Sequence, residues 1–239
     1  MNVVLIGPPG AGKGTHARRL EADFRIPHVV AEPLLHPPSG SSGPELAEVA
    51  GEAEALAPDE RAAQRVDARL QAADCASGFL LEGFPRTQLQ AEFLERRLAA
   101  RGQRLDVVVA LEVPEELLFE RVSGRRVCPR DGRIFNIFSA PPITPGTCNE
   151  CEGPLVQREG ESPDSLSRRL LDYLHEQALL RRFYARRRLW CPVSGDGLIQ
   201  SVYEDMLRAL ADHQAKASSP AGASFRKRAL LLARPPSGH

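Results

Sequence analysis

A short glycine-rich segment that directly follows the first apolar run constrains the fold most. The run Val3–Ile6 leads into residues 7–15, which read Gly-Pro-Pro-Gly-Ala-Gly-Lys-Gly-Thr. The order G-x-x-x-x-G-K, with a hydroxyl residue close behind, is typical of a loop that wraps phosphate groups between a strand and a helix. Its glycines let backbone N–H groups point at phosphate oxygens, and the following helix adds the positive end of its dipole.

The lysine of this loop is unusual for the composition of the chain. Among 31 lysines and arginines, only Lys13, Lys216 and Lys227 are lysines. The first lysine therefore stands where such a loop needs a charge for the outer phosphates, which argues against a chance surface turn. Thr15 offers a hydroxyl for Mg²⁺. The predicted triphosphate-binding residues are Gly10, Ala11, Gly12, Lys13, Gly14 and Thr15.

Composition and charge argue against several classes of protein. The 31 basic residues balance 31 acidic ones, so no overall field attracts nucleic acid or an anionic membrane surface. No apolar run approaches the roughly 18–20 residues that span a bilayer. Five cysteines, an odd number, do not suggest a disulfide scaffold. Since no basic leader and apolar stretch precede the first strand, we expect a cytoplasmic protein with reduced thiols. Separately, we expect a monomer.

Short apolar runs alternate with longer amphipathic stretches along the chain. Five runs are predicted to be strands, at residues 2–6, 28–30, 78–82, 106–112 and 189–193. Helices are expected at 13–23, 58–74, 87–101, 114–122, 163–188 and 198–213, several of which open with proline and acidic residues. Because most strands are apolar throughout, we expect helices on both faces of a parallel sheet. The predicted fold is a three-layer α/β domain.

A second motif makes the hypothesis more specific. Residues 78–87 read Gly-Phe-Leu-Leu-Glu-Gly-Phe-Pro-Arg-Thr, an apolar strand that ends in a carboxylate before Gly-Phe-Pro-Arg-Thr. With the glycine-rich loop and residues 106–126, it resembles adenylate kinase and its nucleoside monophosphate kinase relatives over 1–30 and 56–213. The resemblance implies a P-loop NTPase fold with five parallel strands in the order 2-3-1-4-5. It also implies transfer of the γ-phosphoryl group of Mg·ATP to a nucleoside monophosphate, most simply AMP.

The same resemblance divides the chain into segments. It implies a core at 1–30, 57–122 and 161–213, and a lid at 123–160. A nucleoside monophosphate-binding segment is expected at 31–56. Residues 214–239 are rich in Ser, Pro and Ala and are expected to form a disordered tail.

The resemblance assigns phosphate contacts to arginines, whose planar forks hold phosphate oxygens at two points. Arg86 is expected to hold the acceptor phosphate, Arg121 to pack on the ATP adenine, and Arg125 to bind phosphate at the lid hinge. Arg158 and Arg169 correspond to the pair that closes over the phosphates. The alternative for each of them is an ordinary solvated arginine.

Two further residues receive roles in the same way. Gln90 resembles the residue that reads the base edge of AMP, although glutamine on a helix is often only surface. Glu82 stands where the family has an aspartate that orients Mg²⁺ through water. Its side chain is longer by about one carbon–carbon bond, and a displacement of ~1 Å can slow a reaction about a hundredfold. We expect slow catalysis or a compensating local shift.

The acceptor-binding segment departs from the family pattern. Ala31 stands where a hydroxyl holds the acceptor base, and His36 stands where an arginine holds its phosphate. Losing one charge-assisted contact costs about 1.5–3 kcal/mol, which is about ten- to a hundredfold in affinity. Three hypotheses remain: an adenylate kinase with a weak AMP site, a kinase for another monophosphate, and an ATP-binding sensor with little turnover.

Four residues in the expected lid have the spacing of a metal site. Cys128, Asp131, Cys148 and Cys151 form C-x₂-D and C-x₂-C pairs with 16 residues between them. The interval is typical of zinc knuckles, and zinc accepts a carboxylate oxygen beside thiolates. The alternative for Asp131 is an Asp-Gly hairpin turn. Some members of the family tie the lid with zinc and others use hydrogen bonds, and we expect structural zinc here.

Overall fold

The chain forms two compact units, each described by itself below. The computed structural model describes residues 1–35, 58–157, 163–217 and 227–233. The first unit comprises Met1–Gly7, Gly12–Glu112 and His175–His239, and the second comprises Pro8–Ala11 and Val113–Leu174.

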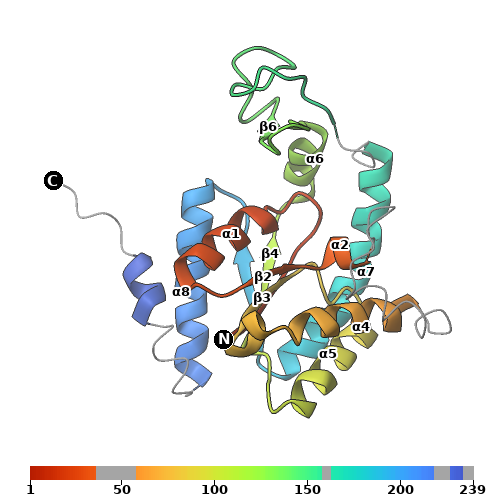
Figure 1. Ribbon diagram of the computed structural model, residues 1–239, viewed down its shortest axis with the longest axis vertical. Helices are drawn as coiled ribbons and strands as arrows, with labels where there is room; N and C mark the ends of the chain where they lie inside the picture. The colour runs from red at the N-terminus through yellow and green to blue at the C-terminus, as the bar shows by residue number, and fades with distance from the viewer. Residues whose placement is uncertain (36–57, 158–162, 218–226, 234–239) are drawn as a thin grey trace. The chain divides into compact units, whose positions relative to one another are not determined.

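A five-stranded sheet forms the centre of the first unit (Figure 1). Its strands are β1 (Asn2–Ile6), β2 (His28–Val30), β3 (Phe79–Glu82), β4 (Val107–Glu112) and β7 (Trp190–Ser194). All four strand pairings are parallel, in the order β2-β3-β1-β4-β7. This confirms the predicted α/β class and, counting these five strands along the chain, the predicted order 2-3-1-4-5.

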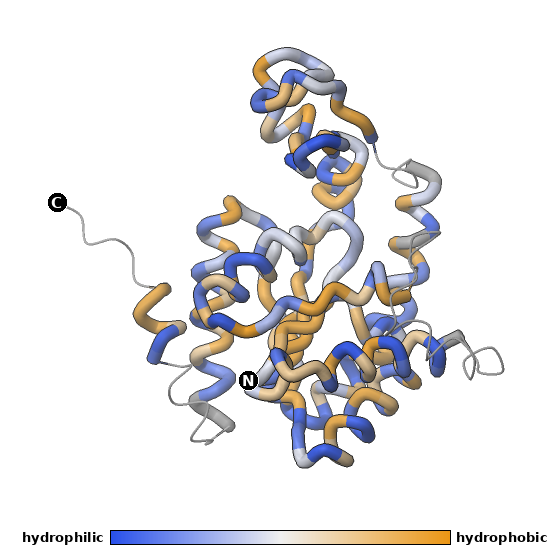
Figure 2. The backbone as a smooth tube through the Cα atoms, viewed as in Figure 1, coloured by the Kyte–Doolittle hydropathy of each residue, from blue (hydrophilic) through white to orange (hydrophobic). Residues whose placement is uncertain are grey.

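Helices cover both faces of this sheet, which explains why its strands are apolar throughout. On one side lie α1 (Lys13–Phe24) and α8 (Ile199–Ala217). On the other side lie α4 (Pro58–Leu70), α5 (Gln88–Ala100) and the C-terminal part of α7 (Pro163–Arg186). Successive side chains of each strand face opposite helix layers. Val4 and Ile6 face the layer of α4, α5 and α7, where they pack with Leu94 and Tyr184. The hydrophobic centre is plain in Figure 2.

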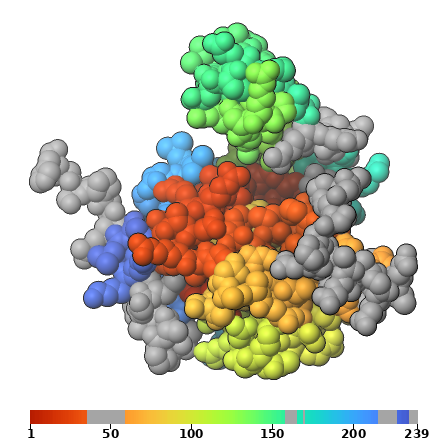
Figure 3. Space-filling view, in the orientation of Figure 1, coloured from red at the N-terminus to blue at the C-terminus, as the bar shows by residue number. Residues whose placement is uncertain are grey.

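A short helix that the sequence did not predict follows β2. Helix α2 (Ala31–Leu35) occupies the beginning of the segment expected at 31–56, and residues 36–57 lie outside the described part of the chain. The Arg65 guanidinium donates to the carbonyls of Leu34 and Leu35 at 3.3 and 3.4 Å, so α4 stabilises the end of α2. In Figure 3 red atoms from the N-terminal part of the first unit adjoin the orange atoms of α4.

Two other element boundaries differ from the predictions. The helix expected at 58–74 ends at Leu70, and a 3₁₀ turn, η1 (Ala73–Ser77), leads into β3. Helix α8 extends to Ala217, and residues 227–232 are helical with Ala229 fully buried, although 214–239 were expected to be a disordered tail. Composition indicates little packing there, so neither the last turn of α8 nor the helix at 227–232 was predicted.

The second unit contains α6 (Glu115–Ser123) and a small antiparallel hairpin of β5 (Arg125–Val127) and β6 (Ile134–Asn136). Gly124 joins α6 to the hairpin. A Cβ at this position would lie 2.6 Å from both Asn136 Oδ1 and Phe138 Cδ2, so the close approach requires glycine. A bridge between Val127 and Val156 closes the unit on its other edge.

None of the described helices combines the length and apolar character that a membrane crossing needs.

Two buried tyrosines of the first unit yield a paired stability prediction. Tyr184 is fully buried, and within the described residues nothing hydrogen-bonds its hydroxyl, whose pKa is raised by burial. The hydroxyl of Tyr203 donates to Asp23 Oδ2 at 2.6 Å. Tyr203→Phe should lower the free energy of unfolding by about 1.5–3 kcal/mol, whereas Tyr184→Phe should leave it unchanged or raise it by about 1 kcal/mol. Urea unfolding measures the free energy of unfolding of both variants. A larger loss of stability in Tyr184→Phe than in Tyr203→Phe would refute this packing.

Candidate functional site

The loop after β1 adopts backbone conformations that glycine tolerates best. Gly10 and Gly12 have φ values of 85° and 86°. A Cβ on Gly10 would also lie 2.7 Å from Val122 Cγ2, so a side chain has no room there. Glycine is therefore required by the geometry of the loop at positions 10 and 12.

The start of α1 is suited to an anion. The Gly12 carbonyl accepts from the backbone N–H groups of Thr15 and His16, and in this described helix no side chain caps the N-terminus. The first turn carries no acidic residue. Lys13 Nζ donates to the Gly7 carbonyl at 2.7 Å, which folds the ammonium back over the loop. Backbone N–H groups, the helix dipole and one ammonium thus converge on the same small region.

The Glu82 carboxylate lies beside this loop. A Cβ placed on Gly14 would be 3.7 Å from each of its two oxygens. The parallel pairing of Glu82 with Leu5 sets this position, because both strands end at the same edge of the sheet. Oxygen donors of this kind, together with the Thr15 hydroxyl, are the ligands that Mg²⁺ prefers. The residues present therefore fit a magnesium ion.

His28 holds the Glu82 carboxylate from the neighbouring strand. Its Nε2 lies 2.8 Å from Glu82 Oε2, and the two side chains are only 8% and 14% exposed. Because an ionised carboxylate can only accept, this ring nitrogen carries the proton and donates it. The contact supplies a local support for the longer side chain that the sequence analysis noted at position 82.

Arg86 and Gln90 come together at the beginning of α5. Gln90 Oε1 accepts from the Arg86 backbone N–H at 2.7 Å, and Gln90 Nε2 donates to Asp59 Oδ1 at 2.8 Å. Asp59 Oδ2 accepts from the Thr87 hydroxyl at 3.0 Å, and Thr87 is the N-cap residue of α5. Gln90 is only 5% exposed, so it is not surface filler. It orders the loop that carries Arg86.

The Arg86 guanidinium faces two acceptors. Its Nε donates to the Gly83 carbonyl at 3.1 Å, and its Nη2 forms an ion pair with the carboxylate of Glu32 in α2. Both charged side chains are well exposed, at 44% for Arg86 and 60% for Glu32. The guanidinium is therefore accessible to a ligand, with one carboxylate of the chain already beside it.

The remaining predicted residues fall in several places. Ala31 is buried at the start of α2, while Arg121 lies in α6 and Arg125 begins β5, both in the second unit. Arg169 lies within α7, but its side chain is outside the part of the chain that the structure describes, as are His36 and Arg158. The structure thus brings Lys13, Glu82, Arg86 and Gln90 into the first unit.

The sequence analysis missed three charged or titratable residues of this unit. His28, Glu32 and Asp59 contact Glu82, Arg86 and Gln90 over separations of 54, 54 and 31 residues. Each has an ordinary interpretation from its sequence context, such as an acidic residue in the first turn of a helix for Asp59. Of the three, only His28 lies in a predicted strand, as the first residue of β2, and no sequence signal marks the other two.

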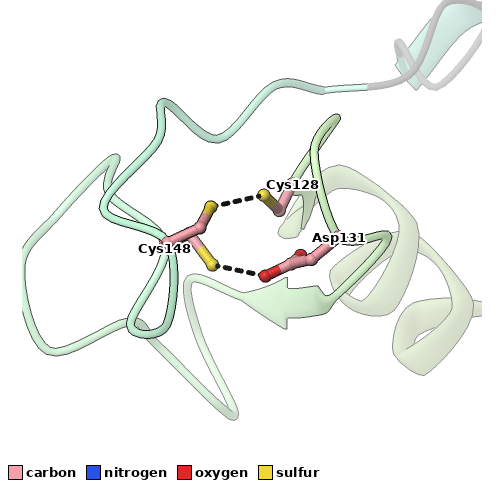
Figure 4. A group of neighbouring side chains, drawn as sticks. Cys128, Asp131 and Cys148 are labelled. Carbon is pink, nitrogen blue, oxygen red and sulfur yellow. Dashed lines mark hydrogen bonds between the residues drawn. The ribbon is translucent and has the colours of Figure 1, made fainter.

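The four predicted metal ligands cluster in the second unit. One ligand atom from each of Cys128, Asp131, Cys148 and Cys151 lies within 4.8 Å of all the others. The Sγ atoms of Cys128 and Cys151 are 3.3 Å apart, as are Cys148 Sγ and Asp131 Oδ2. Figure 4 shows the Cys148 sulfur directed at the Asp131 carboxylate. A zinc ion with bonds of about 2.0–2.3 Å would set tetrahedral edges of about 3.5–3.8 Å, so modest shifts suffice.

Two turns of matching design present these ligands. The carbonyl of Cys128 accepts from Gly132 N–H, and the carbonyl of Cys148 accepts from Glu152 N–H, four residues on in each case. Gly132 and Glu152 both have positive φ, at 73° and 54°. Asp131 therefore occupies in the first turn the place that Cys151 occupies in the second. Its turn is part of the ligand arrangement and is not merely an Asp-Gly hairpin.

Electrostatics within the cluster favours anionic ligands at two positions. The backbone N–H of Arg133 lowers the pKa of Asp131, and the backbone N–H of Gly153 lowers the pKa of Cys151. Burial instead raises the pKa of Cys128 to about 11. A cation bound among these atoms would supply the charge that keeps the Cys128 thiolate deprotonated. The residues present fit zinc, which prefers sulfur and accepts one carboxylate.

Comparison with known proteins agrees with this geometry. The adenylate kinase family profile matches residues 5–189. An adenylate kinase of Moorella thermoacetica is 41% identical over 212 residues, covering 88% of this chain and 98% of its own length. Adenylate kinases of Carboxydothermus hydrogenoformans and an Anaeromyxobacter species (strain Fw109-5) are 39% and 36% identical over 88% of this chain and 99% and 100% of their own lengths. The chain belongs to the adenylate kinase family.

Proposed function

We propose that this protein transfers the γ-phosphoryl group of ATP to AMP and so forms two molecules of ADP. The observation that carries the proposal is that two candidate anion-binding segments follow neighbouring parallel strands of the sheet. The glycine-rich loop follows β1 and the Gly83–Thr87 segment follows β3, and these two strands pair in parallel with Leu5 opposite Glu82. Relatives named adenylate kinase that match this chain along nearly their whole length support the same reaction.

Each residue in this proposal has a role that its position supports. The loop N–H groups and Lys13 hold the outer phosphates of ATP, and Arg86 holds the acceptor phosphate. Gln90 reads the acceptor base with the hydrogen-bonding capacity that Asp59 and the Arg86 backbone leave open. Thr15 and Glu82 would hold Mg²⁺. When bound with ATP, Mg²⁺ supplies positive charge that offsets the charge of the phosphates.

Phosphoryl transfer needs placement and charge more than covalent chemistry. Arginine suits this task because its fork binds two phosphate oxygens at once. In this proposal Arg121 packs on the adenine of ATP, and Arg125, Arg158 and Arg169 contact phosphates as residues 123–160 close. Closure would keep water from competing as the acceptor.

An acceptor panel tests the proposed reaction. Purified protein is supplied with Mg·ATP and, in separate reactions, AMP, dAMP, CMP, UMP or GMP, and ADP formation is followed by a coupled assay. We expect AMP to give the highest kcat/KM. Faster turnover with a pyrimidine or guanine nucleotide would contradict the AMP assignment. Binding of ATP without turnover on any acceptor would favour a nucleotide sensor.

Removal of the loop lysine gives the second prediction. Lys13→Ala should lower kcat/KM by at least about a hundredfold, because one preorganised charge at a transferring phosphoryl group has about this effect. It should also reduce the rise in Tm that saturating Mg·ATP produces in the parent protein. Lys227→Ala removes an exposed lysine in the helix at 227–232 and should change neither quantity. Full activity of Lys13→Ala would exclude the loop as the phosphate site.

We further propose that Cys128, Asp131, Cys148 and Cys151 bind one structural zinc ion. The convergence of three sulfurs and one carboxylate oxygen within 4.8 Å supports this ligand set. The paired turns support Asp131 as a full member, since a cysteine fills the matching position of the other turn. The ion would tie the hairpin of β5 and β6 to the segment around Cys148.

Metal analysis of the purified protein should find about one zinc per chain. Cys148→Ser should lose the metal and lower the Tm, whereas Cys191→Ser, at a buried cysteine outside the cluster, should retain it. Asp131→Cys should also retain zinc, because the turn presents that position as the other turn presents Cys151. A full-length protein without metal, equally stable with and without a chelator, would refute the site.

A further inference from the structure

The ion pair between Arg86 and Glu32 has a consequence for the acceptor site. Arg86 is the residue proposed to hold the acceptor phosphate, and its Nη2 contacts the Glu32 carboxylate. A carboxylate and a phosphate present the same kind of oxygen acceptor to a guanidinium. Glu32 therefore lies against the arginine on which an incoming phosphate depends.

The backbone around Glu32 fixes it in this position. Glu32 lies in the first turn of α2, directly after Ala31, which is fully buried in the core of the first unit. The other end of α2 is held by Arg65, which donates to the carbonyls of Leu34 and Leu35. The short helix is therefore anchored at both ends, and the Glu32 side chain starts from a defined place.

Arg86 is held equally well on its own side. Its backbone N–H donates to Gln90 Oε1 at 2.7 Å, and its Nε donates to the Gly83 carbonyl at 3.1 Å. These bonds leave the end of the guanidinium to meet Glu32. The contact is thus a product of two anchored backbones and not of two long side chains that meet by chance.

We propose that Glu32 competes with the acceptor phosphate for Arg86 and thereby sets the affinity of the protein for its nucleoside monophosphate. The inference rests on the proposed function, in which Arg86 binds that phosphate. Glu32 is a specificity-determining residue in this view, because it acts on the acceptor and not on ATP.

The exposure of the Arg86–Glu32 pair indicates how strongly Glu32 lowers the affinity for the acceptor. The two side chains are 44% and 60% exposed, so water and salt weaken their attraction and Glu32 can swing into solvent when phosphate arrives. Its negative charge still remains near a doubly charged phosphate after the exchange. Together these terms predict an effect of about threefold to tenfold on acceptor affinity, with a marked dependence on ionic strength.

The test uses Glu32→Gln, which keeps the size of the side chain and removes its charge. We expect this variant to bind AMP about threefold to tenfold more tightly by calorimetry without ATP, and to lower the KM for AMP by the same factor. The KM for ATP should stay within about twofold of the parent value. The difference between variant and parent should shrink when ionic strength rises from about 0.05 to 0.5 M.

A matched control removes an equal charge nearby. The control variant is Glu60→Gln. Glu60 lies in the first turn of α4 and is exposed, and within the described residues it makes no ion pair. The variant should leave AMP affinity unchanged. Thermal unfolding of both variants verifies that the fold is intact.

The possible outcomes separate this inference from the proposed function. If the parent protein phosphorylates AMP and Glu32→Gln leaves AMP affinity unchanged or weaker, competition at Arg86 is refuted while the function stands. If Glu60→Gln tightens AMP binding as much as Glu32→Gln does, a general charge effect replaces the specific one. If the parent neither binds nor phosphorylates AMP, the proposed function itself fails.

Discussion

The parallel pairing of β1 with β3 is the constraint on which the candidate site depends. Leu5 lies opposite Glu82, so both strands end at the same edge and the loops that follow them emerge side by side. Ligand sites in open α/β sheets form at this edge because the loops there are free to diverge while the strands stay fixed. A shift of one residue would turn the Glu82 carboxylate away from Gly14 and toward the face covered by α4, α5 and α7, where burying an ion is costly. The register of β1 against β3 therefore decides whether the Glu82 carboxylate can take part in the candidate site.

Charged groups at this edge share one arrangement, in which each has a modest internal partner. Lys13 donates to the Gly7 carbonyl, Arg86 contacts Glu32 and Glu82 accepts from His28. Such partners keep the side chains ordered when no ligand is bound, which lowers the entropy cost of binding. A phosphate or a divalent cation has to displace these partners, and the Arg86–Glu32 pair is itself charge-assisted. The site is preorganised, and the strength of each internal contact tunes how readily a ligand replaces it.

The sequence predicted what depends on local pattern and missed what depends on long-range contact. Continuous apolar runs indicated the five strands, and the C-x₂-D and C-x₂-C spacing indicated the metal cluster, because both signals lie within a few residues. The bonds from Asp59 to Gln90 and from Glu32 to Arg86 cross 31 and 54 residues, and each polar residue alone resembles an ordinary surface position. Helix α2 was missed for a related reason. Arg65, which stabilises its end, lies 30 and 31 residues away from the carbonyls it binds.

The small core of residues 124–157 explains why the ligand cluster of the second unit matters. Among residues 124–157 the buried side chains are few: Val127, Cys128, Pro142 and Cys148. Hairpin strands of three residues each add little, since an isolated hairpin is marginal in water. Half of this core is therefore made of the cysteines that converge on Asp131. A segment that buries so little apolar surface needs a cross-link to hold one conformation, and a metal ion at these ligands would supply it without a disulfide. The shared design of the two turns, with a left-handed residue four positions after each leading cysteine, serves that cross-link better than it serves packing.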